Sequence, residues 1–212
     1  RMRRRFFDGA FTADDDNALW RRGWIKQDSL EQYGRIVVAL DPATTNNTGS
    51  DETGIVVAGL GGDQRGYVLA DESGKFRPEE WARRAISLYD TFSADCIVAE
   101  VNQGGDMVEA LIKAEARGRT IPVRKVTATR AKHVRAEPIA ALYEQGRISH
   151  VGAYPQLESQ MTQMTTAGYE GDGSPDRVDA LVWAFTELFP DMVERQPVAQ
   201  LLPPPRRRGW MA

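Results

Sequence analysis

The strongest structural signal in the chain is the run Arg35-Ile36-Val37-Val38-Ala39-Leu40-Asp41-Pro42. An uninterrupted apolar run rich in β-branched residues is typical of a central strand that is buried on both faces. The Asp-Pro pair that ends the run indicates a loop. The stretch therefore predicts a central strand whose last residue is the carboxylate Asp41.

The segments around this strand indicate a mixed sheet. Strand patterns at 54–59 and 66–70 follow at short intervals, which predicts an antiparallel meander. Strand and helix signals then alternate. The later strands are expected at 96–100 and, in an outer position, 121–126; the helices are expected from Pro78, over 106–116, up to Gly146 with a break or kink at Pro138, over 157–164, and from Pro175 to 188. This order predicts a single α/β domain, a ribonuclease H-like mixed sheet flanked by helices.

The length and composition of the chain limit the other possibilities. With 212 residues and 42% hydrophobic content, the chain suits one domain with a substantial core. We expect an N-terminal arm or linker over residues 1–34, the folded domain over 35–190, and a flexible tail rich in proline and arginine over 191–212. No apolar run approaches the roughly 18 residues of a membrane span, so no membrane partner is expected. One cysteine and two histidines argue against a structural zinc site.

The charge distribution is more informative than the net charge of −3. Between Lys113 and Arg135 the chain carries eight basic residues and one acidic residue, Glu115. A basic stretch inside an otherwise acidic domain suits a protein that grips phosphate on one side and holds metal on another. The alternative is a solvated basic face with no ligand.

Four acidic residues occupy positions next to apolar runs, where burying an ionised carboxylate is energetically unfavourable. Asp41 ends the first strand and Glu100 ends the fourth, and Asp176 and Asp179 share one face at the start of the last helix. Adjacent strands would bring these groups together, and a divalent cation would offset their repulsion and lost hydration. Oxygen ligands without histidine or cysteine indicate two Mg²⁺ or Mn²⁺ ions. Asp41 would bridge both ions, Glu100 would complete one site, and Asp176 with Asp179 the other.

Each carboxylate also has a simpler interpretation. An aspartate before proline is often a turn former, and Glu100 could be an ordinary edge charge. Asp176 could be an acid that favours the helix start. Asp179 is harder to explain in this way, because apolar residues surround it. The combination, more than any single residue, supports a metal site.

Several of these segments resemble the C-terminal nuclease domain of terminase large subunits, in the branch found in tailed phages, prophages and gene transfer agents. The resemblance covers roughly residues 35–189 and is carried by Ala39-Leu40-Asp41-Pro42-Ala43, Ser50-Asp51-Glu52-Thr53-Gly54, Val98-Ala99-Glu100-Val101-Asn102-Gln103-Gly104-Gly105, Arg135-Ala136-Glu137-Pro138-Ile139-Ala140-Ala141-Leu142-Tyr143-Glu144-Gln145-Gly146-Arg147 and Pro175-Asp176-Arg177-Val178-Asp179-Ala180-Leu181. It implies metal-dependent endonuclease cleavage of double-stranded DNA concatemers during capsid filling, in the cytoplasm of a bacterial host. Its implied partners are an ATPase motor domain, the capsid portal and the small terminase subunit.

The resemblance also assigns residues. Its acidic triad falls on Asp41, Glu100 and the Asp176/Asp179 pair, with Asp51 as a further acid near the metals. The expected DNA phosphate contacts are Arg130, Lys132, His133, Arg135 and Arg177. Family members often carry adjacent aspartates where this chain has Pro175-Asp176. That difference leaves open which of Asp176 and Asp179 is the principal third ligand.

Two rival interpretations remain. A junction resolvase of the same fold would prefer branched DNA, and a non-catalytic module that docks on the portal or small subunit would need no metal. The sequence has no Gly-x-x-x-x-Gly-Lys-Ser/Thr motif of an ATPase. We therefore expect an excised domain that would cut DNA without translocating it.

Overall fold

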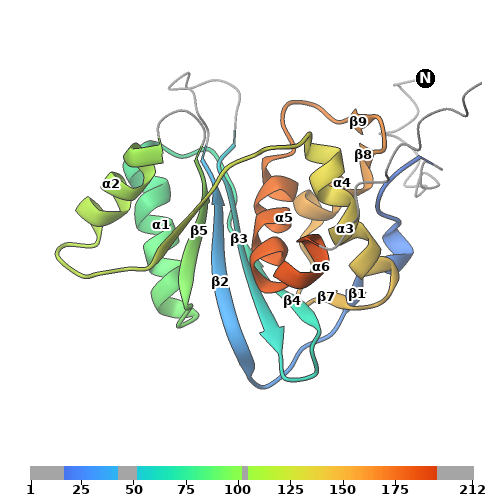
Figure 1. Ribbon diagram of the computed structural model, residues 1–212, viewed down its shortest axis with the longest axis horizontal. Helices are drawn as coiled ribbons and strands as arrows, with labels where there is room; N and C mark the ends of the chain where they lie inside the picture. The colour runs from blue at the N-terminus through green and yellow to red at the C-terminus, as the bar shows by residue number, and fades with distance from the viewer. Residues whose placement is uncertain (1–16, 43–51, 102–104, 195–212) are drawn as a thin grey trace, which may run out of the picture.

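The structure is a computed structural model, and it describes residues 17–42, 52–101 and 105–194. Within these residues the chain forms a seven-stranded mixed sheet in the order β1-β7-β4-β3-β2-β5-β6, with helices on both faces (Figure 1). The sheet strands are β1 (Lys26–Gln27), β2 (Tyr33–Asp41), β3 (Gly54–Gly61), β4 (Gly66–Asp71), β5 (Cys96–Glu100), β6 (Val123–Val126) and β7 (Ile148–His150). The helices are α1 (Pro78–Thr91), α2 (Gly105–Glu115), α3 (Lys132–Glu144), α4 (Pro155–Thr162), α5 (Asp176–Leu188) and α6 (Pro190–Glu194), with the 3-10 turn η2 (Arg22–Trp24) and the separate hairpin β8 (Met164–Thr165) and β9 (Gly168–Tyr169).

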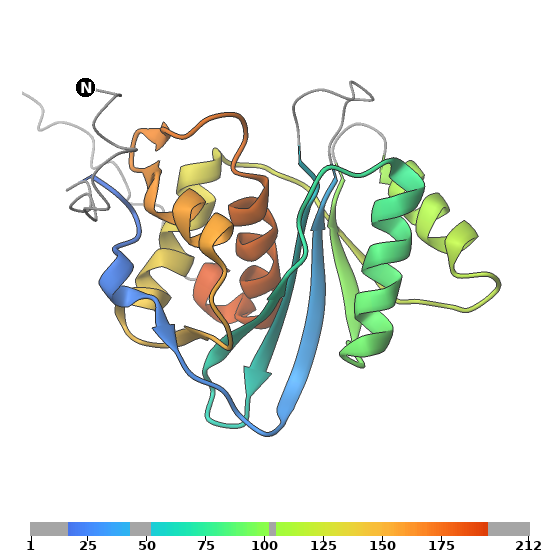
Figure 2. The ribbon, with the colours of Figure 1, turned by 180° about the vertical axis from the view of Figure 1, so that it is seen from behind.

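Strand β2 lies at the centre of the molecule and separates two hydrophobic cores. Val38 and Leu40 belong to the core beneath α1 and α2. Val37 and Ala39, on the opposite face, belong to the core formed with α3, α4 and α5. The front and back views show these two helical layers on either side of the sheet (Figures 1 and 2). The apolar run is therefore uninterrupted because both faces of the strand are buried.

The predicted strand arrangement is confirmed. β2, β3 and β4 form the antiparallel meander. β2 pairs in parallel with β5 through Leu40 and Ala99, which places the next residues, Asp41 and Glu100, at the same edge of the sheet. β6 lies at the end of the strand order, the outer position that Pro122, just before it, suggested.

Two helix predictions need correction. Of the break or kink expected at Pro138, the break is wrong, because α3 runs continuously from Lys132 to Glu144 with this proline inside it. The proline lacks an N–H and so loses its helical hydrogen bond, but the buried side chains of α3 pack against α5 and keep the helix intact. The helix expected over 157–164 spans Pro155–Thr162 instead, and the following residues enter the hairpin β8–β9.

The described part of the expected N-terminal arm packs on the domain. Trp20 is fully buried, and its ring centroid lies 6.3 Å from that of Tyr143 in an edge-on contact. β1 pairs in parallel with β7 and extends the sheet. At the other end, α6 begins before the expected tail and packs against α3 and α5. The domain boundaries drawn from the sequence stay predictions. None of the helices in the described ranges has the length and apolar character needed to cross a membrane.

Gly54 allows α5 to approach the end of β2. It pairs with Asp41 across the β2–β3 ladder. A Cβ atom at this position would lie 2.0 Å from the backbone oxygen of Asp176. Contact this close is sterically forbidden for any other residue, so the first turn of α5 reaches the sheet edge only because residue 54 is glycine.

We predict that Gly54→Ala destabilises the fold by about 1–3 kcal/mol, the usual result of forcing an extra carbon into a packed site. For a domain of this size, each kcal/mol lowers the melting temperature by roughly 2–4 °C. Gly62→Ala is the matched control, because a Cβ there meets nothing within 4 Å. Thermal unfolding of both variants checks the prediction, and equal melting temperatures would contradict it.

Candidate metal centre

Three of the predicted carboxylates meet at the edge of the sheet. Asp41 ends β2, and Asp176 and Asp179 lie in the first turn of α5. Each offers an oxygen atom, and these oxygens all lie within 4.8 Å of one another. Asp176 and Asp179 are buried, with 8% and 2% of their surface exposed. The cluster therefore joins residues that are more than 130 positions apart in the sequence.

Helix α4 helps to fix the start of α5. The side-chain oxygen of Gln160 accepts hydrogen bonds from the backbone N–H groups of Arg177 and Val178, at 3.1 and 3.4 Å. These donors belong to the first turn of α5, which has no partner for them within the helix. Gln160 thus caps α5 from a neighbouring helix and holds the turn that carries the two aspartates.

Glu100 lies beside this group of three and is not part of it. It is buried at the end of β5, with 6% of its surface exposed. Its negative charge is close enough to raise the pKa of both Asp41 and Asp179. One of its oxygens, Oε2, accepts a 2.6 Å hydrogen bond from the indole Nε1 of Trp183. The remaining acid expected near the metals, Asp51, lies outside the described residues.

Two of the carboxylates, Asp41 and Asp179, resist ionisation. Burial, followed by repulsion from Asp179 and Glu100, raises the pKa of Asp41 well above its ordinary value of 3.8. Burial also raises the pKa of Asp179, although Lys132 and Arg135 oppose the shift. A site that disfavours negative charge on its own oxygens gains most from a bound cation.

Lys132 pairs with the carboxylate cluster while part of its side chain stays exposed to solvent. Its ammonium pairs with the Oδ2 atom of Asp179 and donates a 2.9 Å hydrogen bond to the hydroxyl of Ser174. Burial alone would lower the pKa of Lys132, but attraction to Asp179 outweighs it and raises the pKa. The side chain keeps 43% of its surface exposed, so it faces both the carboxylates and solvent.

Arg135, also expected to contact phosphate, lies deeper. Only 10% of its side chain is exposed, and its guanidinium donates to Asp179 Oδ1 at 3.1 Å. Arg130 is exposed just before α3, and His133 is partly buried in its first turn. The helix therefore presents its basic residues at different depths, which the sequence pattern did not distinguish.

Arg177 is engaged by acidic partners. Its guanidinium donates to Glu52 at 2.9 and 3.3 Å and to Asp71 at 2.7 Å. It also bonds to the backbone oxygen of Ser73 at 3.2 Å. These contacts tie α5 to the end of β4 and to the segment before β3. The phosphate contact expected at Arg177 stays a prediction, while its observed role is to fasten α5.

Part of the basic stretch between residues 113 and 135 is likewise paired within the protein. Arg119 binds Asp90, Arg124 binds Glu187, and Lys125 binds Glu109. These pairs reduce the basic surface that the sequence pattern suggested. Within the described residues, Lys132 and Arg135 are the basic side chains that pair with Asp179.

Trp183 is the site residue that the sequence analysis missed. It follows Asp179 by four positions, and residues at this spacing share one face of a helix. In the sequence, this spacing is the feature that could have placed Trp183 on the same helix face as Asp179. The position looked like one more apolar residue of a buried helix, so its N–H was not considered as a donor to Glu100.

The donor set fits a hard divalent cation. Asp41, Asp176 and Asp179 supply oxygen ligands only, and burial together with mutual repulsion disfavours negative charge on Asp41. Mg²⁺ and Mn²⁺ prefer such ligands, whereas zinc favours nitrogen and sulfur. Glu100 lies where a second cation would gain a further carboxylate.

We predict that Asp41→Asn stabilises the metal-free protein at neutral pH. Because the folded state raises the pKa of Asp41, it holds a proton more readily than the unfolded chain does. The resulting cost to stability grows as the pH rises from the ordinary value of 3.8 through the folded-state pKa. A neutral amide removes that cost. Thermal unfolding in EDTA should give a higher melting temperature for the variant. Added Mn²⁺ should stabilise the wild type more than Asp41→Asn. A lower melting temperature in EDTA would contradict the electrostatic argument.

Comparison with known proteins connects this geometry to a family. A family model described as the terminase RNaseH-like domain matches residues 38–188. A search of curated proteins gave no match. Among solved structures, the large terminase nuclease of thermophilic phage G20c is 15% identical with a TM-score of 0.58, and covers 81% of this chain and 98% of its own. The same nuclease with bound magnesium is 16% identical with a TM-score of 0.60, covering 82% and 98%. The nuclease domain of the large terminase subunit gp2 of bacterial virus Sf6 is 16% identical with a TM-score of 0.62, covering 78% and 96%. The α/β fold is thus ribonuclease H-like, and the chain belongs to the terminase RNaseH-like domain family.

Proposed function

We propose that the chain is a Mg²⁺- or Mn²⁺-dependent endonuclease that cuts double-stranded DNA concatemers during DNA packaging into capsids. The convergence of Asp41, Asp176 and Asp179 within 4.8 Å carries the proposal. Membership of the terminase family supports DNA as the substrate. The magnesium-bound G20c nuclease supports a divalent cation in this fold.

The cluster would hold the cations with carboxylate oxygens alone. Asp41, Asp176 and Asp179 would bind one ion, and Glu100 with Asp41 would provide for a second. Two bound cations would activate the attacking water and stabilise the leaving oxygen of the phosphodiester. Because the strand ends and the first turn of α5 already bring the carboxylates together, little rearrangement would be needed on binding.

The basic residues at the rim would receive the DNA backbone. Lys132 is partly exposed beside Asp179, so its ammonium can meet a phosphate that approaches the carboxylates. Arg130 and His133 lie close to it along the chain and would add further phosphate contacts. Contacts of this kind position the duplex without reading its sequence.

The family also suggests the biological setting. We propose that the domain works with an ATPase motor, a capsid portal and a small terminase subunit, in the cytoplasm of a bacterial host. Membership of the tailed-phage, prophage or gene transfer agent branch is part of this proposal. The motor would bring DNA to the metal centre that the described residues form.

A plasmid cleavage assay tests the activity. Supercoiled plasmid is incubated with the protein and Mg²⁺ or Mn²⁺, with EDTA as the negative control. We expect nicking and linearisation that EDTA abolishes and that Asp41→Asn reduces by at least about 100-fold, since loss of a ligand should exceed the effect of losing a partner of a ligand. Asp90→Asn, an exposed aspartate of α1 that is paired with Arg119, should cut as the wild type does.

The same assay separates the rivals. A strong preference for a four-way junction over linear duplex would favour the resolvase. No cleavage, combined with no Mn²⁺ binding in calorimetry, would overturn the nuclease proposal and favour the docking module.

Lys132→Gln should weaken DNA binding in the same way for every sequence. Loss of one phosphate contact reduces the slope of log affinity against log salt by about one. The measurement is a DNA-binding titration at several salt concentrations in EDTA, with the Asp41→Asn background to prevent cleavage. An unchanged slope would show that Lys132 serves the carboxylates only.

A further inference from the structure

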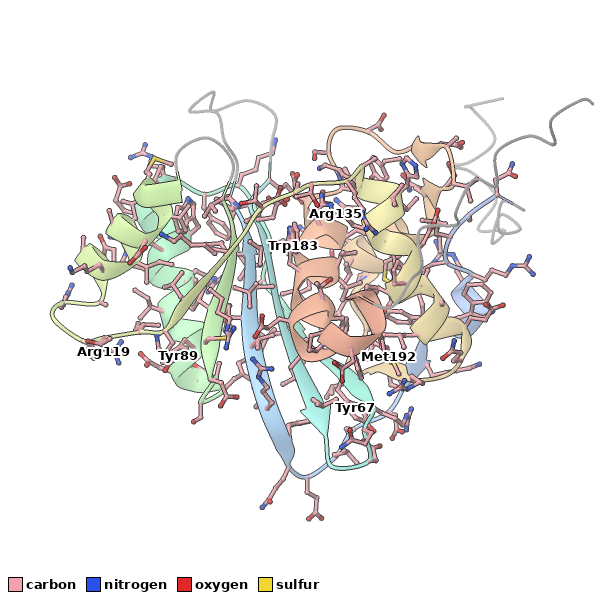
Figure 3. The ribbon with its side chains drawn as sticks, viewed as in Figure 1. Tyr67, Tyr89, Arg119, Arg135, Trp183 and Met192 are labelled. Atoms are coloured by element: carbon pink, nitrogen blue, oxygen red, sulfur yellow. The ribbon has the colours of Figure 1, made fainter. Side chains whose placement is uncertain are left out.

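Trp183 connects two of the proposed metal ligands. It lies on α5, one turn after Asp179, and only 7% of its surface is exposed. Its indole Nε1 donates the 2.6 Å hydrogen bond to Oε2 of Glu100, which belongs to β5. One side chain on the helix thereby fixes a carboxylate on the adjacent strand. Figure 3 shows Trp183 on α5 close to Arg135 of α3.

Arg135 completes the connection. Its guanidinium carbon lies 4.5 Å from the centre of the Trp183 ring, in a cation–π contact. Its Nη2 atom donates to Asp179 at 3.1 Å, and its Nη1 atom lies 3.5 Å from Oε2 of Glu100. Among the described residues, its Nε and Nη1 atoms are buried and have no hydrogen-bond partner. The guanidinium is thus committed to the indole ring and the two carboxylates and is shielded from solvent.

This pair restricts how the carboxylates can move. A glutamate at a strand end has several rotatable bonds, and ordering it on metal binding costs conformational entropy. The indole N–H holds one oxygen of Glu100, which leaves the other oxygen to meet a cation. The planar guanidinium holds Asp179 relative to Glu100 in a way that a flexible ammonium would not. Partners of this kind commonly alter metal affinity 10–100-fold when they are removed.

We infer that Trp183 and Arg135 are positioning residues that preset Glu100 and Asp179 for the metal ions, and that Arg135 serves this role instead of contacting DNA phosphate. The inference rests on the proposed metal-dependent function. The inference gives different roles to two basic residues on consecutive turns of α3. Lys132 faces solvent and would contact the DNA phosphate, while Arg135 holds Glu100 and Asp179 in position.

The test compares two tryptophan variants of the full chain by Mn²⁺ calorimetry. Trp183→Phe keeps a buried ring and the net charge but removes the N–H that reaches Glu100. We expect Mn²⁺ affinity to fall about 10–100-fold. Trp20→Phe is the matched control, because Trp20 is fully buried and its Nε1 atom has no hydrogen-bond partner within the described part of the chain. It should bind Mn²⁺ as the wild type does, whatever it does to the melting temperature.

A second variant tests the role of Arg135 and keeps the inference testable if Trp183→Phe fails to fold. Arg135→Lys keeps the charge but loses the planar contacts, so it should also weaken Mn²⁺ binding and should leave metal-free DNA affinity unchanged. If both Trp183→Phe and Arg135→Lys bind Mn²⁺ like the wild type, the inference is overturned while the metal site stands. If Arg135→Lys lowers metal-free DNA affinity and leaves Mn²⁺ binding intact, Arg135 is a phosphate contact after all. If the wild type itself binds no Mn²⁺, the proposed function fails and the inference fails with it.

Discussion

Carboxylates that are removed from water and pressed together repel one another, and a fold that keeps them so must compensate their charge. Asp176 and Asp179 are buried and Asp41 is half-buried, and the end of β2 and the first turn of α5 hold their oxygens close together. Lys132 and Arg135 supply part of the compensation. The rest is the affinity for a divalent cation that we propose for the site. The packing of α5 on the sheet, the side-chain cap from α4 and the glycine of β3 all serve to keep these oxygens within reach of one another.

The sequence was sufficient for the parts of the fold that have a local signal. The apolar run of β2 is long and continuous because both faces of the strand are buried, and a run of this kind is typical of a central strand. Carboxylates at the ends of β2 and β5 could be brought together by reasoning, because parallel neighbours end at one edge of the sheet. For the same reason, Asp41 and Glu100 could be chosen as site residues from the sequence.

Other features depend on contacts between distant segments and leave little trace in the local pattern. β1 and β7 have two and three residues, and their pairing joins segments more than 120 positions apart. Strands this short carry too few residues to show a period. The break expected at Pro138 followed from local propensity, which packing of α3 on α5 overrides. The depth of each basic residue is also a tertiary property. Lys132 and Arg135 lie on consecutive turns of one helix, yet 43% of the Lys132 side chain is exposed and only 10% of the Arg135 side chain, which packs over the Trp183 ring.

We propose that this cluster of oxygens holds divalent cations, and diffraction can locate such ions directly. Crystals of the protein grown or soaked with MnCl₂ would be measured at the manganese absorption edge, and an anomalous difference map would be calculated. We predict a peak among Asp41, Asp176 and Asp179, with a second density toward Glu100 if two ions bind. A map with no peak at the cluster, and with Lys132 still paired to Asp179 in the presence of Mn²⁺, would contradict the proposed metal site.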